Sequence, residues 1–259
     1  AFTGSTETAH KINSLLAARN GPIVPFIAET GGQNAMIVDS SALPDQVIVD
    51  VMQSAFNSAG QRCSALRVLF LQIDIAPRIL ELLSGALEEL CVGDPALLRT
   101  DVGPIIDRNA CVKLDEHSRH MNNVGKLIGQ ATVGDQYECG AFFAPRAFLI
   151  EDISVLKQEI FGPILHVITY ESNQLNQVID AINKTGYGLT LGIHTRIDAR
   201  AKYIASQVRV GNIYVNRNMI GAAVGVQPFG GEGLSGTGPK AGGPHTLFRY
   251  ATERTISIN

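Results

Sequence analysis

Segments with strand-like and helix-like patterns alternate along almost the whole chain. Short runs rich in Val, Ile, Leu and Phe are followed by longer stretches whose apolar residues recur at helical spacing. This alternation is typical of a layered α/β structure, in which helices cover both faces of a sheet. The predicted strands are 23–28, 34–38, 68–73, 126–128, 142–149, 164–170 and 189–194, and the predicted helices are 6–19, 44–59, 77–90, 107–122, 173–184 and 197–208.

Composition excludes several classes of protein. The 259 residues are 45% hydrophobic and 17% charged, with a formal net charge of -3, so no basic field favours nucleic acid. No apolar run approaches the roughly 20 residues that a membrane span needs, and no signal segment opens the chain. The 4 cysteines show no metal-type spacing, which predicts no metal site and a reduced, cytoplasmic thiol set.

Cys63 stands at a break between two predicted elements. The helix that starts near Pro44 ends at Gly60, and a strand follows Cys63 after a short connection. A thiol on such a connection can face a cleft, and the adjacent Arg62 is expected to lower its pKa. On these local features alone, a buried structural cysteine is a better explanation of the residue than a nucleophile.

Two carboxylates and one turn are candidates for ligand contacts. Glu29 ends the strand 23–28 beside two glycines, where a ligand can approach the backbone closely. Glu159 lies in a loop with Phe161 before a Gly-Pro pair. Gly4 and Ser5 precede the helix 6–19, whose amino terminus could bind an anion. Each feature also has an ordinary interpretation, as a solvated turn, a packing turn or a plain helix cap.

The segment 227–244 is dense in glycine. Such a segment cannot form a core, but its bare backbone N–H groups can surround an anionic ligand. A flexible surface loop is the alternative, although the interspersed Phe, Leu, Lys and Pro residues make a simple linker a poorer explanation.

Taken together, these motifs resemble the aldehyde dehydrogenase superfamily. Phe-Thr-Gly-Ser-Thr at 2–6, Glu-Thr-Gly-Gly at 29–32, the stretch 56–63, Glu-Ile-Phe-Gly-Pro at 159–163 and Pro-Phe-Gly-Gly at 228–231 occur in the family's order. The interval from Glu29 to Cys63 is also the expected one. The family's usual Glu-Leu-Gly-Gly-Lys reads Glu-Thr-Gly-Gly-Gln here, which keeps the carboxylate.

A narrower resemblance is to the 1-pyrroline-5-carboxylate (L-glutamate γ-semialdehyde) dehydrogenases, including the form fused at the C-terminus of bacterial proline utilization A. It rests on Ser64 directly after the cysteine, on Lys-Ala-Gly-Gly-Pro-His at 240–245 and on Ala-Thr-Glu-Arg at 251–254. This resemblance implies oxidation of L-glutamate γ-semialdehyde to L-glutamate with NAD as the cofactor, a step of proline catabolism.

The resemblance also implies roles for individual residues. Cys63 would be the nucleophile and Glu29 the general base. The cofactor would contact four residues, and the substrate another four. These are Gly4, Ser5, Glu159 and Phe161 for the cofactor, and Ser64, Gly242, Gly243 and Tyr250 for the substrate.

Three parts are expected along the chain. Residues 1–28 would be the C-terminal edge of an NAD-binding domain, residues 29–235 the thiol-bearing catalytic domain, and residues 236–259 a glycine-rich substrate-anchor loop with a return segment. The family's Rossmann-type cofactor domain has almost no counterpart here. The sequence is therefore expected to be a fragment that binds NAD poorly and needs the remainder of its parent chain, a homo-oligomer that could be peripheral to a membrane.

Three alternatives remain open. The enzyme could be an aldehyde dehydrogenase of another substrate class. Cys63 and Glu29 could instead serve a cofactor-independent thiol esterase. The fragment could also be an inactive binding protein.

Overall fold

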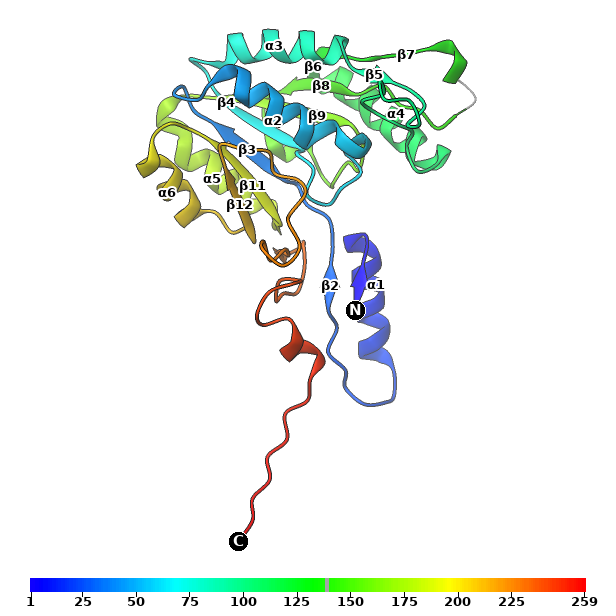
Figure 1. Cartoon of the computed structure of the whole chain (residues 1–259), viewed down its shortest axis with the longest axis vertical. Helices are drawn as coiled ribbons and strands as arrows, with labels where there is room; N and C mark the ends of the chain where they lie inside the picture. The colour runs from blue at the N-terminus through cyan, green and yellow to red at the C-terminus, as the bar shows by residue number, and fades with distance from the viewer. Residues whose placement is uncertain (138–139) are drawn as a thin grey trace.

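A seven-stranded sheet forms the centre of the molecule in the computed structural model, which describes residues 1–137 and 140–259 (Figure 1). The strand order is β12-β11-β3-β4-β9-β8-β6, and neighbouring strands are parallel except for the antiparallel pair β6 and β8. The strands are β3 (Ala35–Val38), β4 (Val68–Gln72), β6 (Gly125–Gln130), β8 (Arg146–Ile150), β9 (Ile164–Tyr170), β11 (Thr190–His194) and β12 (Asn212–Val215).

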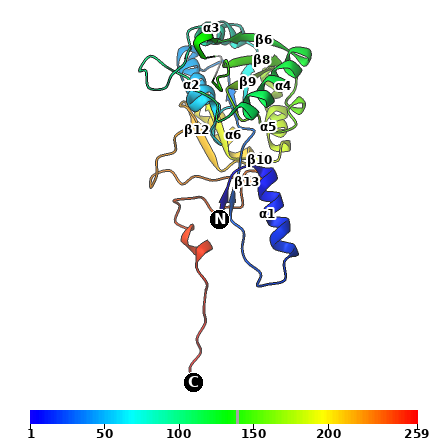
Figure 2. The same cartoon turned by 90° about the vertical axis from the view of Figure 1, so that its right-hand side faces the viewer.

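Helices cover both faces of this sheet, so the predicted layered α/β fold is confirmed. Figure 2 shows α2 on one side of the strands and α4 and α5 on the other. Every residue of β3 and β4 is buried, as expected for parallel strands enclosed by two helical layers. The helices are α1 (Thr6–Ala18), α2 (Pro44–Phe56), α3 (Ala76–Glu88), α4 (Arg108–Val124), α5 (Leu175–Lys184) and α6 (Asp198–Gln207).

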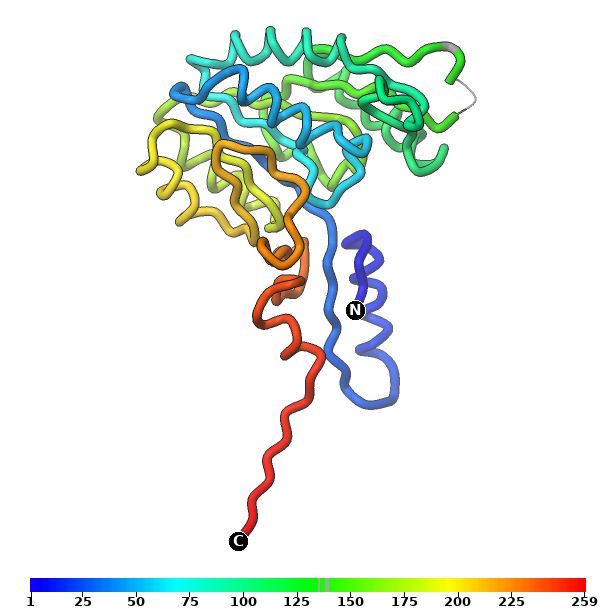
Figure 3. Tube along the Cα trace, viewed as in Figure 1, coloured from blue at the N-terminus to red at the C-terminus, as the bar shows by residue number. Residues whose placement is uncertain are grey.

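The two ends of the chain lie outside the seven-stranded sheet. The short strand β1 (Phe2–Thr3) pairs in parallel with β2 (Ala28–Glu29), and α1 connects them. The last residues extend away from the sheet beyond a short 3-10 helix, η5 (Leu247–Tyr250), as Figure 3 shows. Two further pairs of short strands are β5 (Cys91–Val92) with β7 (Thr132–Val133) and β10 (Tyr187–Gly188) with β13 (Glu232–Gly233).

The structure corrects three details of the predicted elements. The segment 23–28 is not a buried strand: only its last residue joins β2, and Ile23 is 102% exposed because no described residue covers it. The predicted strand 142–149 begins only at Arg146, after Pro145. The edge strand β12 was not predicted; it is short, only Tyr214 of its four residues is buried, and it follows a glycine.

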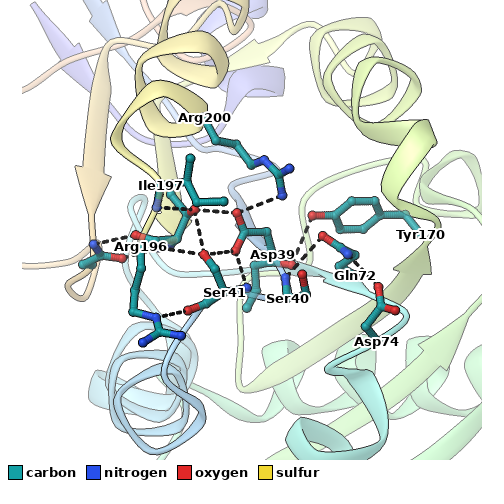
Figure 4. Close-up of polar contacts among 12 residues, drawn as sticks. Asp39, Ser40, Ser41, Gln72, Asp74, Tyr170, Arg196, Ile197 and Arg200 are labelled. Atoms are coloured by element: carbon teal, nitrogen blue, oxygen red, sulfur yellow. Dashed lines mark hydrogen bonds and ion pairs between the residues drawn. The ribbon is translucent and has the colours of Figure 1, made fainter.

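A polar network closes the carboxyl ends of β3 and β11, as Figure 4 shows. One carboxylate oxygen of Asp39 accepts hydrogen bonds from the Ser41 backbone N–H and hydroxyl, at 2.7 and 2.5 Å. The other accepts from the Thr195 hydroxyl at 2.5 Å and from Arg200 at 3.1 Å. Asp39 is only 1% exposed, so these four donors replace the water that its charge has lost. The network fixes the loops after two parallel strands to each other.

The described cysteines are unpaired, and the described helices do not suit a membrane span. Cys63, Cys91 and Cys111 are free thiols, and the fourth cysteine, Cys139, lies outside the described residues. Within 1–137 and 140–259, no helix combines the length and the apolar character that crossing a membrane requires.

Candidate active site

The two predicted catalytic residues and the predicted cofactor ligand Glu159 lie near the amino ends of parallel strands. Glu29 precedes β3, Cys63 precedes β4, and Glu159 precedes β9. Because these three strands are parallel neighbours, the segments that lead into them meet at one edge of the sheet. The fold therefore brings together three residues that are far apart in sequence.

The turn before Cys63 has an unusual backbone. α2 begins with Pro44 at its first turn, as predicted, and ends at Phe56. Ser58, Ala59 and Gly60 then adopt left-handed conformations, with φ values of 56°, 52° and 64°. Such values cost little for glycine but are unfavourable for Ser and Ala, so surrounding contacts must stabilise the turn. The chain reverses sharply here and presents Cys63 at the sheet edge.

Asn34 fixes the backbone of the cysteine. Its side-chain amide donates to the carbonyl oxygens of Cys63 at 2.6 Å and of Ala65 at 2.9 Å. Its amide oxygen accepts from the Thr190 backbone N–H at 3.2 Å. Asn34 is 3% exposed, so its hydrogen bonds are shielded from water and join the Cys63 loop to β3 and β11.

The Cys63 thiol has a raised pKa, contrary to the prediction that Arg62 lowers it. Burial is the main cause, and the negative charges of Glu159 and Glu29 add to it. The Arg62 side chain is exposed and donates to the Ser58 hydroxyl at 2.9 Å instead of neutralising the thiolate. The raised pKa favours the protonated thiol, so a base is needed to remove its proton before it attacks a carbonyl.

Glu29 is a suitable base because its carboxylate is half-buried. Burial raises the pKa of Glu29 to about 7, and a hydrogen bond from the Gly231 backbone N–H partly opposes this effect. Glu29 also forms an antiparallel bridge with Gly236. Its carboxylate lies so close to Gly230 and Gly236 that a Cβ on either residue would approach it to 3.0 and 3.3 Å. The glycine-rich segment thus packs its bare backbone around Glu29.

The Glu159 carboxylate is held from two sides. It forms an ion pair with Arg67 at 3.1 Å, and only 14% of its side chain is exposed. Burial raises its pKa, while Arg67 and the Gly32 backbone N–H oppose the rise. A Cβ on Gly31 would lie 1.7 Å from one carboxylate oxygen, so only glycine fits beside Glu159. The neighbouring Phe161 ring is 46% exposed and faces the Arg67 guanidinium at 5.3 Å.

Gly4 and Ser5 lie beside Glu29 along the β1–β2 pair. The Gly4 backbone N–H donates to the Glu29 carbonyl oxygen at 3.1 Å. Ser5 is the N-cap of α1, and its hydroxyl oxygen accepts from the Thr8 backbone N–H at 3.2 Å. Both residues are exposed, so the amino terminus of α1 is open to a ligand next to Glu29.

The four predicted substrate residues have different positions. Ser64 is buried next to Cys63, with 6% exposure. The Gly243 backbone N–H donates within its own turn, to the Lys240 carbonyl at 3.1 Å and the Thr246 hydroxyl at 3.2 Å, whereas Gly242 is exposed. Tyr250 is 62% exposed on η5, in the C-terminal segment outside the sheet. Of the four, the structure thus places only Ser64 directly beside the thiol.

Sequence reasoning missed Asn34 and Arg67. Both are polar residues at the start of a buried strand, which was the available signal. Only the three-dimensional structure shows that Asn34 holds the backbone of Cys63 and that Arg67 binds Glu159.

Known proteins resemble this chain over almost its whole length. The sequence matches the aldehyde dehydrogenase family over residues 1–256. It is 53% identical to the bifunctional protein PutA of Escherichia coli (strain K12) over 264 residues, which cover 99% of this chain and 20% of PutA. It is 34% identical to the 1-pyrroline-5-carboxylate dehydrogenase of Geobacillus kaustophilus, covering 99% of this chain and 50% of that protein.

Solved structures show the same relationship. A mutant of Bradyrhizobium japonicum proline utilization A superposes with a TM-score of 0.96 at 57% identity, over 99% of this chain and 26% of that one. The 1-pyrroline-5-carboxylate dehydrogenase from Thermus with bound NAD gives a TM-score of 0.86 at 35% identity, over 96% of this chain and 48% of that one. The chain thus spans between a fifth and a half of the length of these relatives. It belongs to the aldehyde dehydrogenase family.

Proposed function

We propose that this chain is the thiol-bearing catalytic part of an NAD-dependent dehydrogenase that oxidises L-glutamate γ-semialdehyde to L-glutamate. The observation that carries the proposal is the position of Cys63, just after a left-handed turn and close enough to Glu29 for that carboxylate to raise the pKa of the thiol. Burial in turn raises the pKa of Glu29 to about 7. The similarity to PutA and to 1-pyrroline-5-carboxylate dehydrogenases supports the choice of substrate.

The reaction starts at Cys63. Its thiol passes a proton to a base, and the thiolate attacks the aldehyde carbon to form a thiohemiacetal. Near neutral pH a substantial share of Glu29 is ionised, since its pKa is about 7, so its carboxylate can accept that proton. Oxidation of the thiohemiacetal leaves the acyl group as a thioester on Cys63.

Hydrolysis then regenerates the thiol. Glu29 first releases to solvent the proton it took from Cys63; it then removes a proton from water, and the resulting hydroxide adds to the thioester carbonyl. The C–S bond breaks, the thiolate of Cys63 leaves and takes up a proton, and L-glutamate is released. A carboxylate with a pKa near the working pH is suited to accept and return protons in both steps.

Residues at the same sheet edge would hold the cofactor. The carboxylate of Glu159 is an acceptor for ribose hydroxyls, and the exposed Phe161 ring offers a flat apolar surface. Gly4 and Ser5, at the open amino terminus of α1, suit a phosphate. These residue types fit a dinucleotide, which when bound would supply the two-electron acceptor for the oxidation.

Substrate choice requires groups that bind the carboxylate at the far end of the semialdehyde. The Ser64 hydroxyl and the backbone amides of Gly242 and Gly243 are neutral donors of that kind. Gly243 would have to release its bonds to Lys240 and Thr246 to contribute. Tyr250 would contact the aliphatic part of the substrate once the C-terminal segment folds over the site.

The proposal includes the setting of the chain. Since the chain spans only part of each relative, we expect it to act within a longer polypeptide that forms a homo-oligomer. We expect this parent protein in the cytoplasm, either free or peripheral to a membrane. The division into an edge of the cofactor domain (1–28), a catalytic domain (29–235) and an anchor segment (236–259) stays a prediction of the same kind.

The test uses the full-length protein that carries this chain. NADH formation is measured with L-glutamate γ-semialdehyde and with a neutral aldehyde of the same length, for wild type, Cys63→Ser and Cys111→Ser. We expect wild type and Cys111→Ser to oxidise the semialdehyde and strongly prefer it, and Cys63→Ser to be inactive.

Other outcomes have clear meanings. Equal rates with both aldehydes would contradict the substrate and leave an aldehyde dehydrogenase of another class. Ester hydrolysis without nicotinamide, in a protein that oxidises neither aldehyde, would identify a thiol esterase. A Cys63 thiol inert toward both substrates and iodoacetamide would point to a binding role.

A further inference from the structure

Arg67 connects the two loops that carry Cys63 and Glu159. It directly precedes β4, and its side chain is 1% exposed. One terminal nitrogen of its guanidinium donates to the carbonyl oxygens of Gly60 at 2.7 Å and Gly162 at 3.1 Å. The other donates to the Arg62 carbonyl at 3.1 Å and to the Glu159 carboxylate at 3.1 Å. The guanidinium thus binds two acceptors in each loop.

The first loop needs such an anchor. Ser58, Ala59 and Gly60 are all left-handed, and two of them carry a Cβ that disfavours this conformation. Arg67 binds the carbonyl at the end of this turn and the carbonyl of Arg62, the residue before Cys63. The position of the thiol therefore depends on the Arg67 guanidinium as well as on Asn34.

The second loop touches the first directly. A Cβ on Gly60 would lie 2.4 Å from the Gly162 carbonyl oxygen, so the two backbones are in contact. Arg67 binds both the Gly60 and the Gly162 carbonyls at this contact, and its guanidinium lies 5.3 Å from the Phe161 ring. Glu159 and Phe161 are thereby fixed relative to the turn that leads to Cys63.

Burying a guanidinium is energetically unfavourable compared with burying an apolar side chain. Removing a charge from water is unfavourable, and an apolar side chain of similar volume often gives equal or greater stability. What an apolar residue cannot supply is a planar fork of fixed N–H directions, and a lysine ammonium lacks that fork as well. The buried guanidinium is therefore explained by the fixed positions that its N–H groups give the two loops, and not by the space that it fills.

We propose that Arg67 is a positioning residue that fixes the Cys63 thiol relative to the Glu159 carboxylate, so that the nucleophile and the group that holds the cofactor ribose stay in register. This role rests on the proposed function of Cys63 and Glu159. With 1% of its side chain exposed, Arg67 would act through Glu159 and the Cys63 loop and not by touching the substrate.

The test compares Arg67→Lys, which keeps the charge, with Arg67→Gln, which keeps an N–H donor but has no charge. Arg146→Met is the matched control, because Arg146 is a part-buried arginine on β8 that stacks on Phe143 and bonds the Ala144 carbonyl. Three quantities are measured on the full-length protein: NAD affinity, the rate of Cys63 alkylation by iodoacetamide, and hydrogen exchange of the 58–64 amides.

We expect both Arg67 variants to stay folded, to bind NAD at least tenfold more weakly and to exchange the 58–64 amides at least tenfold faster. The Cys63 alkylation rate should change at least threefold, and the control should stay within twofold of wild type. Combining Arg67→Lys with Glu159→Gln should weaken NAD binding no more than Glu159→Gln alone, because Arg67 acts on the cofactor through Glu159.

Additive losses of NAD affinity in that double variant would overturn the inference, since a merely structural role predicts them. An Arg67→Lys protein within twofold of wild type in all three measurements would overturn it as well. Wild-type protein is assayed first: if it forms no NADH from the semialdehyde, the proposed function fails. Normal wild-type turnover with an unchanged Arg67→Lys variant removes only the role of Arg67.

Discussion

Replacing Glu29 with glutamine should change how stability depends on pH. The folded protein raises the pKa of Glu29 from 4.5 to about 7, mainly through burial. A carboxyl group whose pKa is raised on folding favours the folded state when it is protonated. Its contribution is therefore fully present below pH 4.5 and is lost as the pH rises through about 7. Above that pH, wild-type protein carries a half-buried charge that the glutamine variant lacks.

The size of the effect follows from the shift. At about 1.4 kcal/mol for each pH unit, a pKa of about 7 in place of 4.5 corresponds to roughly 3 kcal/mol. Because the carboxylate is only half-buried, solvent screening reduces this figure, and about 1.5 kcal/mol is a reasonable expectation. Glutamine keeps an oxygen that can accept the Gly231 N–H, so the hydrogen bond itself need not be lost.

The assay is urea unfolding at several values between about pH 5 and pH 9, for wild type, Glu29→Gln and Glu151→Gln. Glu151 is an exposed carboxylate and serves as the control. Relative to wild type, Glu29→Gln should gain about 1.5 kcal/mol of unfolding free energy between these limits, whereas Glu151→Gln should gain nothing. Parallel pH profiles for wild type and Glu29→Gln would refute the raised pKa and with it the proposed base.

Four further substitutions test contacts at the site and elsewhere in the fold. Gly60→Ala should cost at least about 2 kcal/mol, because its φ is 64° and the new Cβ would lie 2.4 Å from a carbonyl oxygen. Gly85→Ala, in a helix with open space around it, should instead stabilise the protein by about 0.5–1 kcal/mol. Thermal melts of both variants measure this difference, and equal effects of the two substitutions would contradict the argument. Asp39→Asn should cost about 2–4 kcal/mol in urea unfolding, since a neutral amide cannot accept from all four donors, and a loss below the error of the method would show that the network adds nothing. Burial lowers the pKa of His117 to about 4, so its contribution to the free energy of unfolding is present above pH 6.5 and is lost as the pH falls toward 4. His117→Phe should therefore reduce the acid-induced loss of unfolding free energy by about 2 kcal/mol, and an unchanged loss would refute the lowered pKa.

Local signals explain which parts of the site could be predicted from the sequence. Pro44 at the first turn of α2 and Gly60 before Cys63 are short-range features, so the break before Cys63 was predicted correctly, although α2 itself ends at Phe56 and not at Gly60. The alternation of strands and helices likewise depends on nearby residues, and the layered sheet followed from it. The roles of Glu29 and Glu159 came from the resemblance to a family, and the structure adds that both carboxylates raise the pKa of Cys63.

Long-range contacts explain what could not be predicted. Arg62 is adjacent to Cys63 in sequence, but its side chain hydrogen-bonds to Ser58. The pKa of the thiol is instead set by burial and by the charges of two carboxylates. Arg67 lies four residues beyond the cysteine, and its importance depends on Glu159, which is 92 residues away. The segment 23–28 has the composition of a buried strand, yet burial requires a covering surface that composition cannot reveal.

The carboxyl-end and amino-end edges of the parallel strands differ in what they hold. In open parallel sheets, ligands usually bind beyond the carboxyl ends of the strands, at the point where the connections diverge. Here β3 and β11 diverge at such a point, but the Asp39 network fills it and leaves Asp39 1% exposed. Cys63 and Glu159 lie at the opposite, amino edge, where β2 leads into β3 and the glycine-rich segment bridges Glu29. The segments before β4 and β9 supply Cys63 and Glu159 at that edge, and we expect the remaining walls of the site to come from outside the seven strands. This is the structural reason why we expect the thiol and its base to be preformed in this chain, while cofactor binding depends on further residues of the parent protein.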